Sequence, residues 1–200
     1  MARGSSRRLD HRGARRRAGH DLSRGRAADV VRPVRPSDLR HLAAVEEAGG
    51  VLFREHLGEL SAALSAPAPS GAERAAEPGH LLVATSDREV VGFAHVLVLE
   101  DGHDRIAHLE QVSVLPEHGR RGLGARLVRA AAEEARWDGF DRLTLCTYRD
   151  VPWNAPFYAR IGFEVVEPRG VLGELRDRER SRGLDEAGER VVMALPLGHR

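Results

Sequence analysis

The pattern of apolar and polar residues predicts a strand, a turn and a helix in the centre of the chain. Residues 108–115 alternate in side-chain character and contain β-branched residues, which is typical of a strand, and Pro116 ends it. Beyond a polar turn, apolar residues recur at helical spacing and form one face: Leu123, Leu127, Val128, Ala131 and Ala135. This order places the polar turn at the start of a helix.

Similar patterns predict elements on both sides of this centre. Apolar stretches bounded by turn residues predict further strands at 31–35, 80–85, 90–100, 142–147, 163–167 and 190–195. Helical spacing predicts helices at 39–49, at 51–64 with a break near Gly58, at 154–161 and at 172–182. Ser37 is expected to cap the first helix, and residues 66–79, rich in Ala, Pro, Ser and Gly, are expected to form a loop.

These elements predict one domain of the α/β (α+β) class. Three consecutive antiparallel strands lead into the central strand–helix–strand unit, whose crossover is expected to be right-handed. The result is a mixed sheet with helices on its faces. A chain of 200 residues, with 42% hydrophobic and 30% charged residues, suits one globular domain with a sizeable core.

The start of the chain differs in kind from the rest. Residues 1–30 hold nine arginines and three aspartates and few large apolar residues, which predicts a disordered tail at 1–29 ahead of a folded domain at 30–200. A basic arm can bind nucleic-acid phosphates. No aromatic residue interleaves these arginines to stack on bases, so we do not favour a nucleic-acid partner.

Other features of the composition limit the classes of function. No apolar run approaches the roughly 18 residues that span a bilayer, and the N-terminus lacks the apolar segment of a secretory signal. The single cysteine, Cys146, excludes internal disulfides and multi-cysteine zinc sites. His95, His103, His108 and His118 show no metal-ligand spacing. We therefore expect a cytoplasmic protein with no membrane partner and no metal.

The turn before the central helix contains Gly119, Gly122 and Gly124. Backbone N–H groups at a helix start lack intrahelical partners and point outward with the positive end of the helix dipole, which suits a phosphate group. Glycine lets an anion approach the backbone, and Arg120 and Arg121 add charged donors. A surface turn that merely tolerates glycine explains the same spacing, so both interpretations stay open.

Two nucleotide-binding motifs do not fit this turn. The chain contains no lysine, which excludes a P-loop and lysine Schiff-base chemistry. A dinucleotide-binding motif would place a third glycine at position 127, which is leucine. The phosphate ligand, if there is one, belongs to another class.

These residues resemble the GNAT superfamily of N-acetyltransferases, whose acetyl-CoA motif follows a strand. Gly122 and Gly124 match the two small positions of that motif, and Arg120 and Arg121 supply its basic character. Gly119 stands where the family usually has Arg or Gln, which removes one side-chain contact and leaves the backbone cradle. The block at 150–166 matches a later helix–strand segment of the family through Asn154, Phe157, Tyr158, Gly162 and Phe163.

The resemblance implies a mostly antiparallel central sheet with helices on both faces and a splayed cleft between the fourth and fifth strands. Acetyl-CoA would be the cosubstrate, with its pantetheine arm paired to exposed backbone. Its pyrophosphate would lie on the N–H groups of residues 119–125. Asn154 would bond the pantetheine near the thioester, alone or besides capping a helix. The implied backbone and turn contacts are Val112, Ser113, Val114, Gly119, Arg120, Arg121, Gly122, Leu123, Gly124 and Ala125.

Attack of an amine on a thioester needs a neutral amine and a proton for the leaving thiolate. His108 and Glu110 are two apart on one strand and therefore point to the same face, where the resemblance implies a base. We favour Glu110, which lies nearer the expected thioester, and keep His108 as the alternative base or as a packed strand histidine. The resemblance gives Tyr158 as the acid that protonates the sulfur. Cys146 is expected to be a buried strand cysteine rather than an acyl carrier.

The resemblance places the acceptor pocket against the two helices expected at 39–64. Glu46, Glu47, Phe53 and Arg54 are candidate acceptor contacts, although a solvated or packed helix residue explains each of them as well. The expected function is transfer of an acetyl group to a primary amine of a small molecule, by direct attack in a ternary complex. A protein or peptide amine as acceptor, a non-catalytic CoA-binding sensor module, and a homodimer stay open.

Overall fold

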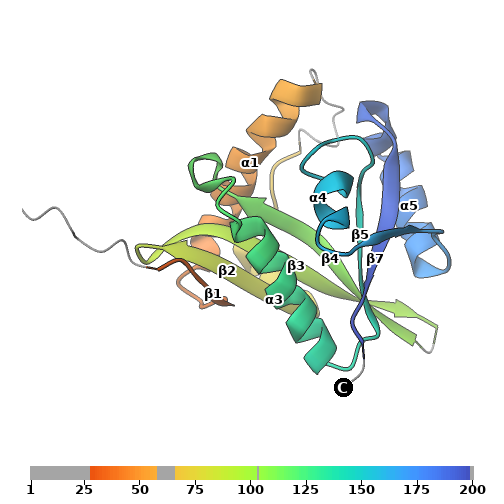
Figure 1. Cartoon of the computed structure of the whole chain (residues 1–200), viewed down its shortest axis with the longest axis horizontal. Coiled ribbons are helices and arrows are strands. Elements are labelled where there is room, and N and C mark those ends of the chain that lie inside the picture. Colours follow the sequence, from red (N-terminus) through yellow and green to blue (C-terminus); the bar gives the residue numbers. More distant parts are fainter. Residues whose placement is uncertain (1–27, 58–65, 103, 199–200) are drawn as a thin grey trace, which may run out of the picture.

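A seven-stranded sheet forms the centre of the computed structural model, which describes residues 28–57, 66–102 and 104–198 (Figure 1). The strands lie in the order β1-β2-β3-β4-β5-β7-β6, and only β4 and β5 are parallel neighbours. This arrangement confirms the expected mixed, mostly antiparallel sheet. Their bounds are β1 Val30–Pro33, β2 Gly79–Ser86, β3 Glu89–Asp101, β4 Asp104–Val114, β5 Arg142–Tyr148, β6 Glu164–Val166 and β7 Arg190–Pro196.

Helices cover both faces of the sheet (Figure 1). The α-helices are α1 Leu42–Leu57, α2 Gly71–Ala76, α3 Leu123–Trp137, α4 Ala155–Ala159 and α5 Val171–Ser181. Short 3₁₀ turns are η1 Leu39–His41, η2 Pro116–His118 and η3 Leu184–Ala187. We call the side covered by α3 and α4 the α3 face, and the side covered by α1, α2 and α5 the α1 face.

The apolar stripe of α3 forms the main core. Leu127, Val128 and Ala131 are fully buried and belong to a cluster with alternate residues of the central strands, such as Ala94 and Leu143. The intervening residues of the same strands point to the α1 face, where Phe93 belongs to a smaller cluster with Leu42 and Val45 of α1. The period of two along the strands thus divides the apolar residues between two cores.

The strands β4 and β5 part beyond their first contact. They pair only at Ala107 with Leu143 and at His108 with Thr144, and the last six residues of β4 have no β5 partner. On its other side, β4 carries a bulge, because His95 of β3 faces Gln111 while the next residue faces Leu109. The bulge inserts Glu110 as an extra residue at the point where the strands separate. The expected splay between the fourth and fifth strands is confirmed.

The two helices expected at 39–49 and 51–64 are one helix over the residues that the structure describes. The helix α1 runs through Gly49 and Gly50 to Leu57, and the expected break near Gly58 lies outside the described residues. Gly49 does not break the helix, and α1 packs over β4 at this point, where a Cβ on Gly49 would make an ordinary contact, 3.7 Å from Ser113 Oγ. Tertiary contact therefore overrides the low helix propensity of glycine.

Two further local predictions are wrong. Ser37 does not cap a helix: Asp38 occupies the N-cap of η1, and its carboxylate accepts hydrogen bonds from the Arg35 N–H at 2.7 Å and from Arg32. The expected loop at 66–79 contains α2. A capping box starts this helix, since Ser70 Oγ accepts from the Glu73 N–H at 3.2 Å and Glu73 accepts from the Ser70 N–H at 2.7 Å.

Candidate active site

The turn between β4 and α3 presents free backbone donors. Gly122 is the N-cap of α3 with φ of 77°, and no side chain caps this end. The Gly119 N–H donates to Pro116 O at 3.0 Å, so it is engaged within the turn. The N–H groups of residues 120–125 have no hydrogen-bond partner among the described residues. The turn therefore offers consecutive donors at the positive end of a 15-residue helix.

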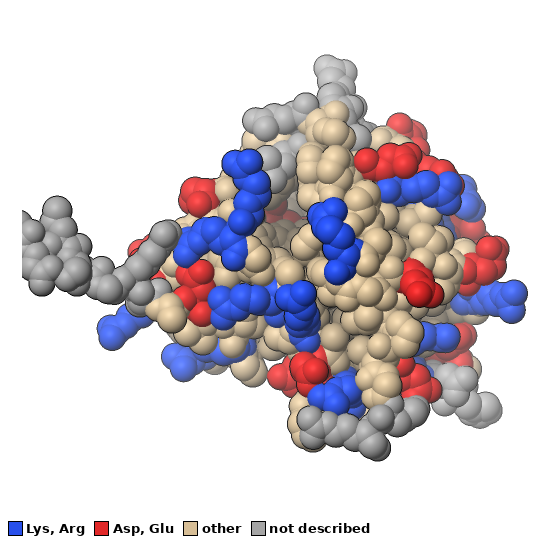
Figure 2. All heavy atoms as spheres, viewed as in Figure 1, with Lys and Arg blue, Asp and Glu red and all other residues tan. Residues whose placement is uncertain are grey.

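The two arginines of this turn differ in how they are held. Arg121 donates to the Asp29 carboxylate at 2.9 and 3.0 Å and lies 2.9 Å from His118 Nδ1. Arg120 is exposed and has no partner in the part of the chain that the structure describes. Figure 2 shows blue basic side chains gathered along this side of the molecule, over the region of α3. Arg120 is thus the arginine of the pair that a bound anion reaches without breaking an ion pair.

Backbone and side-chain groups next to the splay are also unoccupied. Val112 and Val114 pair with β3 on one side and with no strand of the described residues on the other. Asn154 is the N-cap of α4 and only 8% exposed, yet its side chain makes no capping hydrogen bond. The backbone carbonyl of Asn154 accepts hydrogen bonds from the N–H groups of Phe157 and Tyr158 at 2.8 and 2.9 Å. The amide of Asn154 therefore remains available to a ligand.

Tyr158 lies on α4 among aromatic rings. Its ring centre is 5.1 Å from that of Phe157 and 5.6 Å from that of Phe163. Burial raises the pKa of Tyr158 to about 12, so the phenol keeps its proton at neutral pH. Its hydroxyl has no hydrogen-bond partner among the described residues. These properties fit a proton or hydrogen-bond donor.

His108 is held as a neutral side chain within the sheet. Its Nδ1 lies 3.0 Å from Thr144 Oγ1, whose hydroxyl donates to Ala107 O at 3.0 Å. Because that hydroxyl has one proton, His108 Nδ1 must be the donor to Thr144. Burial lowers the pKa of His108 to about 4. The histidine is therefore a weak base.

Glu110 belongs to an ionic cluster on the α1 face, which we call the Arg74 cluster: Glu46, Arg74, His95 and Glu110. Arg74 donates to Glu110 Oε2 at 2.7 Å and, through its other terminal nitrogen, to Glu46 Oε2. His95 Nδ1 lies 3.1 Å from Arg74 and 3.4 Å from Glu110 Oε2. Burial raises the pKa of Glu110, but the hydrogen bonds and charges of His95 and Arg74 outweigh it, and the pKa is lowered.

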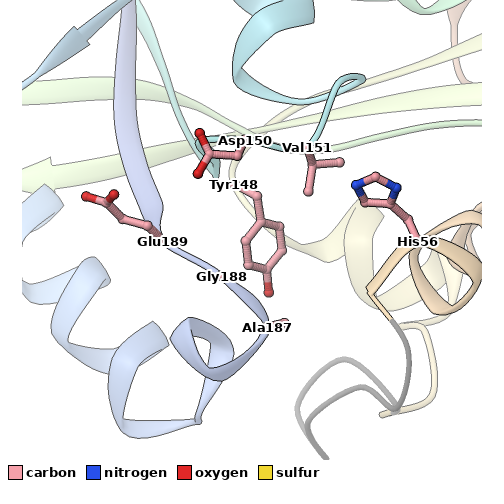
Figure 3. Close-up of a pocket in the computed structure, with 7 residues that line it drawn as sticks. All are labelled: His56, Tyr148, Asp150, Val151, Ala187, Gly188 and Glu189. Atoms are coloured by element: carbon pink, nitrogen blue, oxygen red, sulfur yellow. The ribbon is translucent and has the colours of Figure 1, made fainter.

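A pocket of about 100 Å³ opens at the end of β5, past the point where β4 parts from it (Figure 3). Tyr148 ends β5, and its ring stands between the carboxylates of Asp150 and Glu189 on one side and His56 of α1 on the other (Figure 3). Glu189 pairs with Arg149 at 2.5 Å. The lining residues are His56, Tyr148, Asp150, Val151, Ala187, Gly188 and Glu189.

Aromatic rings support the α1 side of this pocket. Phe53 packs on Tyr148 and Trp153, with ring centres 6.1 and 5.8 Å apart, and His56 lies 4.9 Å from Trp153. Of the other candidate acceptor contacts, Glu47 is exposed, and the side chain of Arg54 lies outside the described residues. Sequence reasoning did not identify Asp150 or Glu189 as pocket residues.

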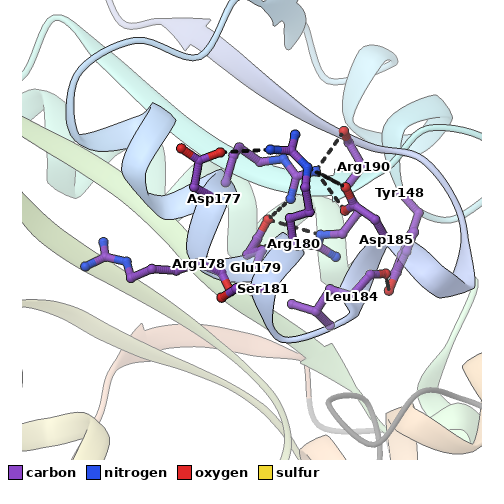
Figure 4. Close-up of polar contacts among 10 residues, drawn as sticks. Tyr148, Asp177, Arg178, Glu179, Arg180, Ser181, Leu184, Asp185 and Arg190 are labelled. Carbon is purple, nitrogen blue, oxygen red and sulfur yellow. Dashed lines mark hydrogen bonds and ion pairs between the residues drawn. The ribbon is translucent and has the colours of Figure 1, made fainter.

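A network of ion pairs holds the opposite wall of the pocket (Figure 4). Arg176 of α5 is buried and donates to Glu179 at 2.5 Å and to Asp185 at 2.8 Å. Arg190 at the start of β7 donates to Glu179 at 2.6 Å, and Tyr148 Oη donates to Leu184 O at 2.8 Å. Because these contacts fix residues 184–190 to α5 and β5, they position the segment that lines the pocket.

Cys146 lies beside this network and is not set up as a nucleophile. Burial and the nearby Glu179 charge raise the pKa of its thiol to about 12. In the described part of the chain, no three His, Cys, Asp or Glu side chains group as metal ligands. None of the described helices is long and apolar enough to cross a membrane.

Residues 51–163 match the model of the acetyltransferase (GNAT) family. Over 92 residues the chain is 32% identical to the uncharacterized N-acetyltransferase YjgM of Escherichia coli (strain K12), a match that covers 46% of this chain and 55% of YjgM. The chain thus spans about half the length of that curated relative.

Solved structures share the fold at low sequence identity. The ribosomal-protein-S18-alanine N-acetyltransferase of Escherichia coli has a TM-score of 0.58 at 19% identity, over 86% of this chain and 96% of that one. N-acetylglutamate synthase from Neisseria gonorrhoeae, complexed with coenzyme A and N-acetyl-glutamate, has a TM-score of 0.60 at 18% identity, over 86% of this chain and 36% of that one. These likenesses confirm the architecture expected from the sequence.

Proposed function

The chain belongs to the acetyltransferase (GNAT) family, and we propose that it moves an acetyl group from acetyl-CoA directly to a primary amine of a small molecule. One observation carries the proposal: β4 parts from β5 beside a helix start whose N–H groups at 120–125 are free of partners among the described residues. An extended arm and an anionic diphosphate together match these two features.

The proposed binding mode uses backbone more than side chains. The free side of β4 at Val112–Val114 would pair with the amides of the pantetheine arm, and the turn would bind the diphosphate. Asn154 would bond the arm near the thioester, because its buried amide has no capping bond to satisfy it. Arg120 would add a charge-assisted donor.

The proposed reaction is a direct displacement. The neutral amine attacks the thioester carbonyl carbon, a carbon–nitrogen bond forms, and the carbon–sulfur bond breaks. Tyr158 stabilises the departing sulfur by donating from its protonated phenol. The proton lost by the amine passes to the carboxylate site at Glu110, which lies at the bulge where β4 parts from β5, rather than to His108, which is buried between paired strands beside Thr144.

The pocket at the end of β5 supports a small cationic acceptor. Its volume of about 100 Å³ holds roughly three waters at about 30 Å³ each, which is room for an aminoalkyl group. Asp150 gives the lining a negative charge that attracts an ammonium group, whereas the charge of Glu189 is balanced by its ion pair with Arg149. The Tyr148 ring supplies apolar lining only, because it is 2% exposed and the Arg190 guanidinium already lies over it, 4.8 Å from the ring centre.

The test combines binding and turnover. Calorimetry with coenzyme A measures binding, and thiol release measures transfer from acetyl-CoA to spermidine, glucosamine, glycinamide and a short peptide with a free N-terminus. We expect coenzyme A binding and amine-dependent thiol release with one of the small amines. Transfer to the peptide alone would assign a peptide acceptor. Binding without any amine-dependent release would assign a sensor module, and no binding would reject the proposal.

A further inference from the structure

We infer that Glu46 of α1 takes the proton from the acceptor amine, and that Arg74 of α2 is a positioning residue that holds Glu46 and Glu110 on one guanidinium. The inference rests on the proposed function and adds a catalytic residue to it. It also changes the role of Glu110, which becomes the carboxylate that fixes Arg74 rather than the group that receives the proton.

The contacts of Arg74 define this arrangement. One terminal nitrogen bonds Glu110 Oε2 at 2.7 Å, and the other bonds Glu46 Oε2. Each carboxylate thus uses Oε2 for the guanidinium, and neither Oε1 has a hydrogen-bond partner among the described residues. The fork geometry of arginine sets the separation of the two carboxylates, which lysine could not do with one nitrogen.

Arg74 is fixed before any ligand binds. Its side chain is 3% exposed and lies over the Phe93 ring, 5.2 Å from the ring centre. Its buried Nε has no partner in the described residues, an unusual cost for a group that serves structure alone. The helix that carries it is pinned to η1, because a Cβ on Gly71 would lie only 2.2 Å from Leu39 O.

The position of Glu46 matches the free side of β4. Gly49 follows Glu46 on α1 at a spacing of three residues, and a Cβ added to it would lie 3.7 Å from Ser113 Oγ of β4. The helix therefore crosses β4 beside the stretch that has no β5 partner. Glu46 lies on the α1 face, opposite the face of α3, so an acceptor reaching it would approach the splay from the side away from the α3 helix.

The two carboxylates differ as bases. The pKa of Glu46 is raised, chiefly by burial. The negative charge of Glu110 raises it further, and the charges of Arg74 and His95 lower it by less. The pKa of Glu110 is lowered, because His95 and Arg74 bond it directly. Paired groups whose pKa values are pushed apart divide the acid–base work between them. Glu46 is the stronger base of the two.

The amine nitrogen bonds the thioester carbon, its surplus proton moves to Glu46 Oε1, and the sulfur leaves with the electron pair of the carbon–sulfur bond. Glu110 and Arg74 keep their ion pair throughout. The protonated Glu46 returns its proton to solvent, because the Glu46 side chain is 22% exposed and solvent can reach it.

Steady-state kinetics test whether Glu46 is the general base, and coenzyme A affinity shows whether the variant keeps its cofactor site. Glu46→Gln should lower kcat by about 10²-fold or more, the usual range for a general base, with coenzyme A affinity unchanged within twofold. The deficit should persist as the pH approaches the pKa of the amine, because the proton that Glu46 takes is lost only after the neutral amine has attacked. Glu77→Gln, an exposed glutamate at the end of α2, is the matched control and should keep the wild-type rate.

Arg74 variants separate positioning from folding. Arg74→Gln removes a charge that lowers both carboxyl pKa values, so the acid limb of kcat against pH should move to higher pH. Arg74→Lys retains the charge and should leave that limb in place while kcat falls, because one nitrogen replaces the fork. If both variants lose only stability and keep the wild-type pH profile and kcat, Arg74 is structural and the inference fails.

A titration without substrate distinguishes failure of this inference from failure of the proposed function. Carboxyl carbon NMR of glutamate-labelled protein, assigned with Glu46→Gln and Glu110→Gln, should show Glu46 titrating at higher pH than Glu110. The reverse order, or full activity in Glu46→Gln beside an inactive Glu110→Gln, would overturn the assignment to Glu46. A wild-type chain that shows this order but transfers no acetyl group would contradict the proposed function alone.

Discussion

Two residues of the proposed site, Tyr158 and Asn154, carry polar side-chain groups without a hydrogen-bond partner among the described residues. Tyr158 has a protonated hydroxyl with no partner among the described residues, and burial raises its pKa to about 12. Asn154 is buried, and its amide makes no capping bond. Neither group is among the fully buried polar side-chain atoms that lack a partner, so both remain open to a bound molecule. Both side chains can therefore donate hydrogen bonds to a ligand.

Tyr158→Phe removes the hydroxyl and keeps the ring packing. We expect kcat to fall by about 10²-fold, because the sulfur loses its donor, while acetyl-CoA affinity changes less than twofold. Steady-state kinetics and calorimetry on the same preparation measure the two effects. An unchanged kcat would remove this role from Tyr158.

His108 makes stability depend on pH. Its pKa is about 4 in the folded chain and about 6.5 when unfolded, so between these values the unfolded chain binds the additional proton. The free energy of unfolding should therefore fall as the pH drops from 6.5 to 4, by up to about 3 kcal/mol. Urea unfolding at several pH values measures this slope. His108→Gln, which cannot take up the proton, should show a shallower slope over the same range.

At the scale of elements, sequence reasoning succeeded where one pattern decided the outcome. The stripe from Leu123 to Ala135 predicted α3 because its apolar face is also its buried face. It failed at α2, a helix of six residues whose capping signal, Ser70 with Glu73 three residues later, lay within a segment rich in Pro and Gly. It failed again at Gly49, where two helices were expected and one runs through, because the packing of α1 over the sheet outweighs the low helix propensity of a glycine.

Some parts of the candidate site could be predicted from the sequence, and others could not. The backbone parts of the proposed cofactor site follow from local sequence, since Gly122 and the strand before it are neighbours in the chain. The Arg74 cluster does not, because Arg74 is 28 residues from Glu46 and 36 from Glu110. No spacing rule reaches across such distances, and the pairing depends on how α2 packs over the sheet.

The element pair α5 and β7 gives a further prediction. Arg176→Gln should lower the free energy of unfolding by about 3 kcal/mol, because Glu179 and Asp185 lose a buried partner. It should also raise the KM for the amine more than that for acetyl-CoA, since Arg176 holds Asp185, which lies two residues before the lining segment Ala187–Glu189. Arg180→Gln on the same helix is the control. Arg180 is 62% exposed, and its loss should change stability by less than about 0.5 kcal/mol.

At the scale of the whole molecule, the proposed cofactor would fill the space where two strands separate. A ligand that binds only the folded chain stabilises it by mass action, by about 2.7 kcal/mol at 100 times its dissociation constant. Coenzyme A and acetyl-CoA should therefore raise the melting temperature by several degrees. ATP at the same concentration is the control, and an equal shift with ATP would show that the turn binds phosphate without recognising the pantetheine arm.

In the described residues, β4 and β5 pair at two adjacent positions only, and these pairs alone join strands β1 to β4 to strands β5, β7 and β6 within the sheet. Without ligand, β5, β7 and β6 can open from the other strands as a cooperative unit, because few hydrogen bonds hold the seam. Amide hydrogens in that half should exchange with solvent faster than those of β2 and β3. A pantetheine arm bound between β4 and β5 would pair with β4 as an additional strand. Cofactor binding would therefore also make the β5, β7 and β6 half of the sheet more rigid.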